Sequence, residues 1–173
     1  SMEQKSGDPD NMVMESVKLN ADGIAPIQAE LARIAAVKDK SEIFPLMTEL
    51  GLKGIGGYFG EYIGADIMDS KSNLFQIGQG GISLGEKEYY IDVDEATKNI
   101  REKYKAHIVK MFQLAGFDEA AAQKKMEAVL AIETRIAKAS YSAVEQRDPA
   151  ANYHKMTVDE FKKEYAGIDW DLY

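Results

Sequence analysis

Gln79-Gly-Gly-Ile-Ser-Leu-Gly-Glu-Lys-Glu-Tyr-Tyr-Ile91 is the stretch at which the chain changes character. Before it, glycines and aromatic residues alternate in short strand-like runs; after it, apolar residues follow helical spacing almost to the end. Its glycines allow a sharp turn, because glycine takes positive φ angles without steric cost. Leu84, Tyr89 and Tyr90 offer apolar surface that can hold the turn against a core. The stretch therefore predicts a structural elbow.

A phosphate-binding loop is the alternative interpretation of these glycines. Such a loop has the spacing Gly-x-Gly-x-x-Gly and leads directly into a helix. The run from Gly78 to Gly81 lacks that spacing, so the elbow is favoured.

Upstream of the elbow, the sequence predicts a β-hairpin at about residues 57–78. The runs Tyr58 to Asp66 and Leu74 to Ile77 are strand-prone, and Asp69 to Asn73 between them is typical of a turn. Glycines weaken each strand but let a neighbouring segment approach closely.

Downstream of the elbow, two long helices are expected. Asp94 is a candidate N-cap for a helix over residues 95–115, which Gly116 ends, and Asp118 is a candidate N-cap for a helix through about residue 140. A two-residue connection makes the helices an antiparallel pair. The positions expected to face inward are Ile100, Tyr104, Ile108, Met111 and Phe112 in the first helix and Ala122, Met126, Val129, Leu130, Ile132 and Ile136 in the second.

Shorter helices are expected near both ends of the chain. The three before the hairpin run from Asn11 to about Asp22, from Pro26, and from an N-cap at Ser41 to a stop at Gly51; the last follows the capping box from Thr157 to Glu160 and ends near Tyr165. The predicted fold is mainly α, a helical domain with a long antiparallel helix pair and one small β-hairpin. Residues 1–11 are expected to be a flexible tag or leader and residues 12–173 a single domain. Trp170, the sole tryptophan, suggests a fragment boundary.

Composition excludes several classes of function. The 173 residues carry 21 basic and 29 acidic side chains, a net charge of −8, which disfavours a nucleic-acid partner because phosphates are repelled. There is no cysteine for a disulfide, a thiolate metal site or a nucleophile. No apolar run approaches the roughly 18 residues of a membrane span. The 45% of hydrophobic residues is ordinary for a folded domain.

No self-contained active site emerges from the residues. Zinc hydrolases commonly carry His-Glu-x-x-His on one helical face, whereas this chain has only His107 and His154, and Met111 stands one turn after the first. His107 is expected at the edge of the core and His154 at the surface or in a hydrogen bond. The sequence predicts no catalytic, cofactor-binding or metal-binding residue in this chain.

Other chemistry-bearing residues also have structural explanations. The acidic pairs Glu86/Glu88 and Asp92/Asp94 are expected by chance among 29 acidic residues, and Ser140 and Ser142 lack the glycine context of a nucleophile. Arg147 and Asp148 form either a buried ion pair or a turn brace, and the brace is favoured. The lysine pairs 124–125 and 162–163 are interpreted as solvated helix faces.

Several separated strings, taken together, resemble the amino-terminal region of the neprilysin family of zinc metalloendopeptidases, whose bacterial members include the PepO-type oligopeptidases. The elbow is similar to the family string Gln-x-x-Leu-Gly-Leu-Pro-x-Arg-Asp-Tyr-Tyr. It retains Gln79, Leu84, Tyr89 and Tyr90 and departs at Ile82, Ser83, Gly85, Lys87 and Glu88. Residues 104–117 and 128–140 match two following helices. The most specific string is Arg147-Asp-Pro-x-x-x-Tyr153-x-Lys155-Met-Thr157.

The resemblance implies a longer parent enzyme. In that family this region belongs to a mainly helical, non-catalytic domain that caps the catalytic domain and encloses a cavity, limiting substrates to small peptides. The zinc ligands and the general-base glutamate lie in the carboxy-terminal part, where zinc-activated water attacks a peptide carbonyl. The implied partners are the missing catalytic domain and, in the parent, peptide substrates, and this chain alone is expected to be inactive. The hairpin and the elbow are expected to face that domain or the cavity.

Two other hypotheses remain open at this point. The chain could be a free-standing helical interaction or scaffold protein derived from that domain, or a hydrolase with an unrecognised carboxylate site. The resemblance favours a bacterial parent exported to the periplasm, the cell surface or the medium, and leaves a cytoplasmic parent open.

Overall fold

The computed structural model describes residues 16–171, and the chain divides into two compact units between Asp39 and Lys40. In the first unit, helix α2 (Ser16–Asp22) ends at Gly23, whose φ is +51°. A 3-10 turn, η1 (Ala25–Ile27), with Pro26 in its first turn leads into α3 (Gln28–Ala36). The predicted start near Pro26 is therefore confirmed, whereas the predicted start at Asn11 lies outside the described residues. The prediction of one domain over residues 12–173 stays a prediction.

The second unit begins with a 3-10 turn, η2 (Lys40–Glu42), that runs into α4 (Ile43–Leu52). Ser41 is not the N-cap that the sequence predicted, because it lies inside this turn. The residue before α4, Glu42, keeps helical angles (φ −82°, ψ −15°), whereas a capping side chain needs an extended backbone. The helix also continues one residue beyond the predicted stop at Gly51.

Strands β1 (Phe59–Asp66) and β2 (Asp69–Gln79) form one antiparallel hairpin, with Ile63 opposite Phe75. The predicted hairpin is present, but its turn is Ile67 and Met68 and not the turn-prone run from Asp69 to Asn73. The Met68 N–H donates to the Asp66 carboxylate at 2.8 Å, which closes the short turn. The polar run is therefore the first part of β2, and a carboxylate in contact with distant residues decides where the chain reverses.

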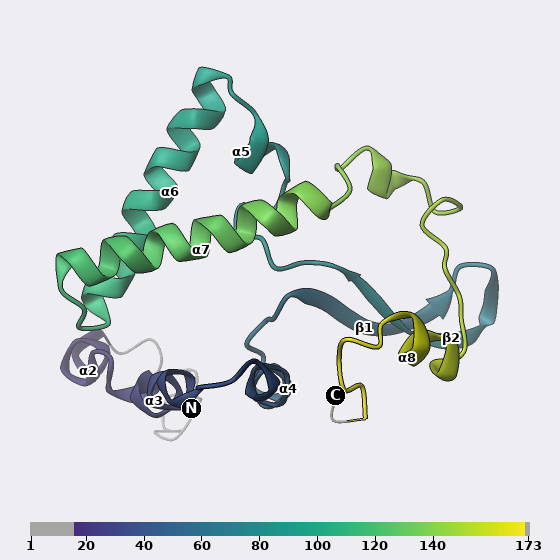
Figure 1. Cartoon of the computed structure of the whole chain (residues 1–173), viewed down its shortest axis with the longest axis horizontal. Helices are drawn as coiled ribbons and strands as arrows, with labels where there is room; N and C mark the ends of the chain where they lie inside the picture. Colours follow the sequence, from purple (N-terminus) through teal and green to yellow (C-terminus); the bar gives the residue numbers. More distant parts are fainter. Residues whose placement is uncertain (1–15, 172–173) are drawn as a thin grey trace, which may run out of the picture. The chain divides into compact units, whose positions relative to one another are not determined.

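Helices α6 (Glu95–Leu114) and α7 (Glu119–Ala139) form the predicted long pair. The Asp94 carboxylate accepts the Thr97 N–H at 3.0 Å, and the Asp118 carboxylate accepts the Ala121 N–H at 2.8 Å, so both predicted N-caps are confirmed. Figure 1 shows that the two helices meet at their shared turn and diverge from it. The short helix α5 (Glu88–Ile91) packs against both.

The inward faces of this pair agree only partly with prediction. Ile108, Ala122 and Met126 are buried, but Met111 and Ile132 are 52% and 46% exposed. The helices diverge and α5 is a single turn, so part of each apolar stripe is left exposed among the described residues. An apolar stripe at helical spacing predicts that one face of the helix is buried, but it does not show which element buries that face.

The last segment contains a 3-10 turn, η3 (Glu145–Arg147), and helix α8 (Val158–Glu164). The Thr157 and Glu160 side chains form the predicted capping box. The Trp170 ring then packs against Phe161 of α8, with ring centroids 4.6 Å apart, and against Phe44 and Phe59 at 6.3 and 5.9 Å. The tryptophan thus joins α8 to α4 and β1.

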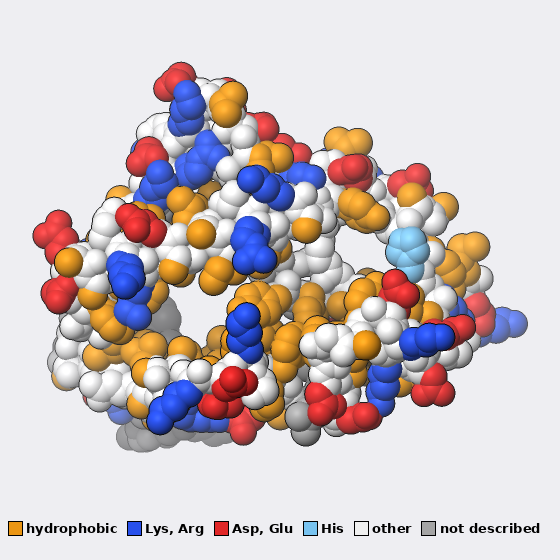
Figure 2. Space-filling model, in the orientation of Figure 1, with side chains coloured by type: hydrophobic (Ala, Val, Ile, Leu, Met, Phe, Trp, Pro, Cys, Tyr) orange, Lys and Arg blue, Asp and Glu red, His pale blue; other side chains and the backbone are white. Residues whose placement is uncertain are grey.

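The fold is mainly α with one β-hairpin, as predicted, and its buried core is small. Six hydrophobic residues are buried in the described part of the chain, whereas 23 large ones are exposed. Figure 2 shows many hydrophobic side chains on the face in view. Within residues 16–171 no helix is long and apolar enough to cross a membrane. Polar contacts between distant segments must therefore contribute much of what holds the unit together.

Candidate functional site

The elbow lies alongside the carboxyl-terminal half of α7. The Gln79 side-chain amide donates to the Tyr141 carbonyl at 3.0 Å and accepts the Tyr141 N–H at 2.8 Å. The two bonds resemble a hydrogen-bonded residue pair of an antiparallel sheet. The Lys87 ammonium donates to the Ser140 carbonyl at 2.5 Å, where a cation is favoured by the dipole of α7. The predicted structural elbow is thus tied to the end of this helix.

Gly81 lets the elbow lie directly on the start of the hairpin. Its φ is +76°, and a Cβ there would stand 2.9 Å from the Tyr58 carbonyl oxygen and 3.2 Å from Ile136 Cδ1. A side chain would therefore meet backbone on one side and α7 on the other. This is the close approach for which glycine is required.

Glu133 of α7 is the buried centre of the elbow contact, with an exposed fraction of 8%. One carboxylate oxygen, Oε1, accepts the Ser83 hydroxyl at 2.6 Å and the Ser83 N–H at 3.3 Å. The other, Oε2, accepts the Tyr90 and Tyr104 hydroxyls at 3.0 and 2.8 Å. The Glu133 carboxylate thus accepts four hydrogen bonds, and an ionised carboxylate can only accept. The single carboxylate links the elbow, α5, α6 and α7.

The tyrosines of this network are held as hydrogen-bond donors. Burial raises the pKa of Tyr90 and of Tyr104, and the Glu133 carboxylate raises both further. The Tyr90 hydroxyl also accepts the Leu84 N–H at 3.0 Å. The raised pKa values of both phenols favour the protonated form, in which each hydroxyl donates to the Glu133 carboxylate.

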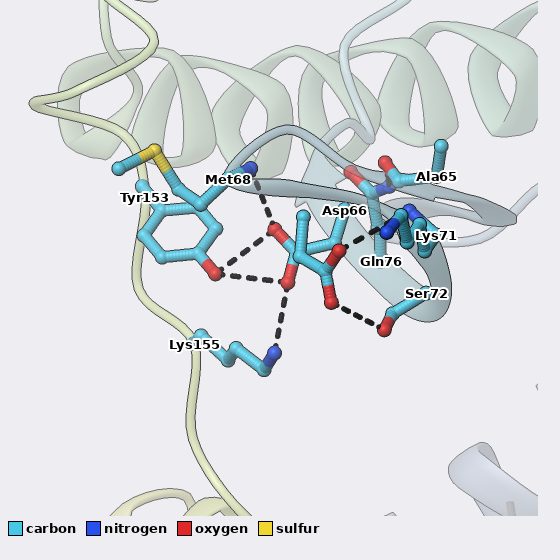
Figure 3. A network of polar contacts seen from close by, with 9 residues as sticks. Ala65, Asp66, Met68, Lys71, Ser72, Gln76, Tyr153 and Lys155 are labelled. Atoms are coloured by element: carbon cyan, nitrogen blue, oxygen red, sulfur yellow. Dashed lines mark hydrogen bonds and ion pairs between the residues drawn. The ribbon is translucent and has the colours of Figure 1, made fainter.

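Asp66, at the end of β1, is the second buried carboxylate, with an exposed fraction of 2%. Figure 3 shows it between the Tyr153 hydroxyl and the Lys155 ammonium. The hydroxyl donates at 2.9 Å to Oδ1, and the ammonium donates at 2.8 Å to Oδ2. Together with the Met68 N–H, these donors tie the hairpin turn to the segment that precedes α8.

The electrostatics of this group favour an ion pair. The Lys155 hydrogen bond, assisted by the Met68 N–H, lowers the pKa of Asp66 to about 2. The Asp66 carboxylate in turn raises the pKa of Lys155, and burial raises the pKa of Tyr153. All these groups are held in one protonation state at neutral pH, which suits a clasp better than an acid–base catalyst.

Sequence reasoning predicted neither carboxylate as a structural centre, although Glu133 lies within the string 128–140 that resembles the family. Asp66 stands 87 and 89 positions from Tyr153 and Lys155, and no local pattern links such distant residues. Tyr90, Tyr153 and Lys155 did carry a signal, since they belong to the strings that resemble a known family. The structure now gives those strings a common role, because each reaches one of the two carboxylates.

The residues singled out for chemistry in the sequence are not brought together. His107 is exposed and not at the edge of the core as predicted, because its side chain lies one position before the buried Ile108, and His154 is exposed as predicted. The Ser140 hydroxyl donates to the Ile136 carbonyl at 2.9 Å. The Ser142 hydroxyl lies 2.7 Å from the Glu145 carboxylate, whose pKa is lowered chiefly by the Ser142 N–H. Both serines therefore stabilise chain turns.

Of the Arg147–Asp148 pair, only Asp148 braces the turn, by accepting the Ala150 and Ala151 N–H groups at 3.0 and 3.1 Å. Arg147 is exposed, and no ion pair joins these two described side chains. The favoured turn brace is thus present, but the arginine has no part in it.

An open groove lies beside the elbow. It measures about 440 Å³ and is lined by Tyr58, Ile132, Arg135, Ile136 and Ala139. Arg135 is its single charged lining residue, so the groove lacks the several converging polar groups that usually fix a small ligand.

The residues described do not fit a metal ion. Over residues 16–171 no three histidine, aspartate or glutamate side chains come together as ligands, and structural or catalytic zinc sites need at least three. The two buried carboxylates are already saturated by donors. No chemical step through a metal can be assigned to this part of the chain.

Known proteins share the sequence and the fold of this chain. Residues 2–173 match the model of the amino-terminal part of peptidase family M13. Human endothelin-converting enzyme 1 is 32% identical over 114 residues, which are 65% of this chain and 15% of that enzyme. The cryo-EM structure of the zinc metalloprotease Zmp1 of Mycobacterium tuberculosis in its open state is 32% identical, covers 89% of this chain and superimposes with a TM-score of 0.81. The inhibitor complex of Zmp1 gives a TM-score of 0.82 at the same identity.

The chain spans only a part of these relatives, 15% of human endothelin-converting enzyme 1 and 23–24% of the Zmp1 chains. The match over nearly the whole of this chain, in sequence and in fold, confirms the resemblance that its separated strings suggested. The chain belongs to peptidase family M13, a family of zinc metallopeptidases, and corresponds to its amino-terminal part.

Proposed function

We propose that this chain is the non-catalytic helical part of a zinc metalloendopeptidase and that it walls the substrate cavity of the parent enzyme. The single observation that carries the proposal is the state of its two buried carboxylates. Asp66 and Glu133 are each saturated by hydrogen-bond donors from distant segments. They would hold the wall together, because the ionisable groups around them are engaged with one another.

In the proposed enzyme the chemistry belongs to the remainder of the polypeptide. That remainder would supply the zinc ligands and the general base, and zinc would activate water for attack on a peptide carbonyl. This chain would act by exclusion, since a rigid wall admits short or extended peptides and rejects folded proteins. Its partners would be the catalytic domain and, within the cavity, the peptide substrate.

The test compares this 173-residue chain with the protein encoded by its full reading frame. Each is assayed for zinc content and for cleavage of a quenched fluorescent peptide, with and without a chelator. We expect the short chain to be inert and free of stoichiometric zinc, and the full protein to bind zinc and lose activity to the chelator.

Two outcomes overturn the proposal. Turnover by the short chain that survives chelation would reveal a hydrolase with its own carboxylate site. A reading frame that ends without a zinc-binding motif would instead favour a free-standing scaffold protein. The wall itself is tested with folded and unfolded forms of the same substrate, because a full protein that cleaves folded proteins as fast as their unfolded chains does not limit access.

A further inference from the structure

The open groove beside the elbow is formed by one face of α7 and by Tyr58. Its α7 residues are Ile132, Arg135, Ile136 and Ala139, whose spacing of i, i+3, i+4 and i+7 places them on one side of the helix. The Tyr58 and Ile132 side chains are 44% and 46% exposed. The groove is therefore an accessible apolar surface that contains one cation.

The walls of the groove are fixed by the elbow. The Glu133 carboxylate ties this part of α7 to the Ser83 hydroxyl at 2.6 Å. A Cβ at Gly81 would stand 3.2 Å from Ile136 Cδ1 and 2.9 Å from the Tyr58 carbonyl oxygen, so the elbow lies against both sides of the groove. A surface that is already ordered loses little conformational entropy when it binds a ligand. The groove is therefore a preformed binding surface.

The Arg135 side chain is exposed, and no hydrogen bond or ion pair joins its guanidinium to the described residues 16–171. The nearby Glu133 carboxylate already accepts four hydrogen bonds. Lys138 lies one turn further along α7, and Figure 2 shows the basic side chains that lie over this helix. The guanidinium is thus available to a carboxylate from another molecule, which it can bind through two parallel N–H groups.

The shape and charge of the groove limit its occupant. One cation in an open groove does not fix a small molecule, so the occupant must also be held at other points, as a long peptide is. The chain as a whole has a net charge of −8 and repels acidic peptides. A cation in the groove can therefore select peptides that carry a carboxylate beside apolar groups.

We propose that the groove is a substrate subsite of the parent enzyme, in which Arg135 binds an aspartate or glutamate side chain of the peptide. Tyr58 and Ile132 would contact an apolar side chain next to it. The open groove lets the peptide continue past Arg135, which favours an interior side chain over a chain end. This inference rests on the proposed function, because it requires that the groove face the substrate cavity.

Paired peptides test the inference on the protein encoded by the full reading frame. Two quenched fluorescent peptides differ at one position, which is glutamate in one and glutamine in the other, and kcat/KM is measured for each. The position is moved along the peptide one residue at a time, because the scissile bond is held by the proposed catalytic domain. Arg135→Gln removes the charge and Arg135→Glu reverses it. The control Lys138→Gln removes an exposed charge of α7 that does not line the groove.

At one position the parent protein should prefer the glutamate peptide, chiefly through a lower KM. Arg135→Gln should reduce this preference about tenfold, because a charge-assisted hydrogen bond is lost. Arg135→Glu should instead prefer a peptide with lysine at that position over the one with glutamate. Lys138→Gln should keep most of the preference of the parent protein. Added salt should weaken the preference, because it screens exposed charges.

Each contrary outcome has its own meaning. An unchanged preference in Arg135→Gln, in a protein that holds zinc and is active, overturns this inference and leaves the proposed function intact. An equal loss of activity on both peptides shows that Arg135 contacts the protein itself and also overturns the inference. A preference that responds to amidation of the peptide carboxyl terminus, and not to the glutamate, overturns the assignment to a side chain. Absence of zinc and activity in the full protein overturns the proposed function and this inference together.

Discussion

At the scale of single residues, two buried carboxylates, Asp66 and Glu133, connect distant segments of the second unit. Glu133 receives only neutral donors, whereas Asp66 has a lysine partner. Burying a charge costs several kcal/mol unless hydrogen bonds replace its water. Both sites meet that condition, and no buried side-chain polar atom among the described residues lacks a partner.

Glu133→Gln should destabilise the chain by about 1–3 kcal/mol. The glutamine amide nitrogen donates two hydrogen bonds and accepts none, so it would face hydroxyl groups that also donate. The free energy of unfolding is measured by urea titration with circular dichroism. The control Glu127→Gln changes an exposed residue of the same helix and should stay within about 0.5 kcal/mol of the parent chain. Equal effects of the two substitutions would contradict the role assigned to Glu133.

The Asp66 clasp predicts an acid-sensitive contribution to stability. The pKa of Asp66 is about 2 in the folded chain against an ordinary 3.8, so the folded state favours the ionised form. Its contribution is complete above about pH 4 and is lost as the pH falls towards about 2.

Asp66→Asn should therefore lower stability at neutral pH. It should also make the loss of stability between about pH 4 and about pH 2 smaller than in the parent chain. Thermal melts at a series of pH values measure both effects. Asp159→Asn, which removes an exposed carboxylate of α8, should leave the shape of the acid decline unchanged. An Asp66→Asn curve that runs parallel to that of the parent chain would refute the clasp.

At the scale of elements, the elbow is the joint between the hairpin and the helices. Sequence reasoning located it from its glycines and tyrosines, and located both long helices from Asp94 and Asp118. It placed the hairpin turn wrongly, because the local polar run favours a turn at residues 69–73 while the Asp66 contacts favour Ile67 and Met68. Tertiary contacts overrode local preference there.

Gly81→Ala should cost clearly more than Gly85→Ala. Both glycines have positive φ, +76° and +81°, which costs an alanine about 1–2 kcal/mol. A Cβ at residue 81 would also stand 2.9 Å from the Tyr58 carbonyl, whereas nothing lies within 4 Å of one at residue 85. We expect the excess loss for Gly81→Ala, measured by urea unfolding, to be about 1–3 kcal/mol. Equal losses would mean that the elbow does not press on the hairpin.

At the scale of the whole molecule, the described residues are held together by the polar contacts of Asp66 and Glu133 and by only a small core. The exposed apolar side chains of the described residues are surfaces that further polypeptide can cover. The residues that could serve catalysis are scattered or engaged in caps and turns. This arrangement of the described residues is what the wall proposed under Proposed function requires.

Metal removal separates this chain from its proposed parent. A bound ion stabilises only a protein that holds it in the folded state. The melting temperature of the 173-residue chain should change by less than about 1 °C on addition of a chelator, whereas that of the full protein should fall. A chelator-dependent melt of the short chain would show a metal site that the ligand pattern does not reveal.

The sequence by itself determined the helical class, the long helix pair, the capping residues and the family, because caps, periodicity and motif strings are local and survive in one dimension. Only the tertiary structure decided that Asp66 meets Tyr153 and Lys155, that Glu133 joins the elbow to three helices, and that Ile132 and Met111 remain exposed. These features depend on which distant segments come together. Such pairings follow from the balance of burial and hydrogen bonding over the whole chain, and no short stretch of sequence contains that balance.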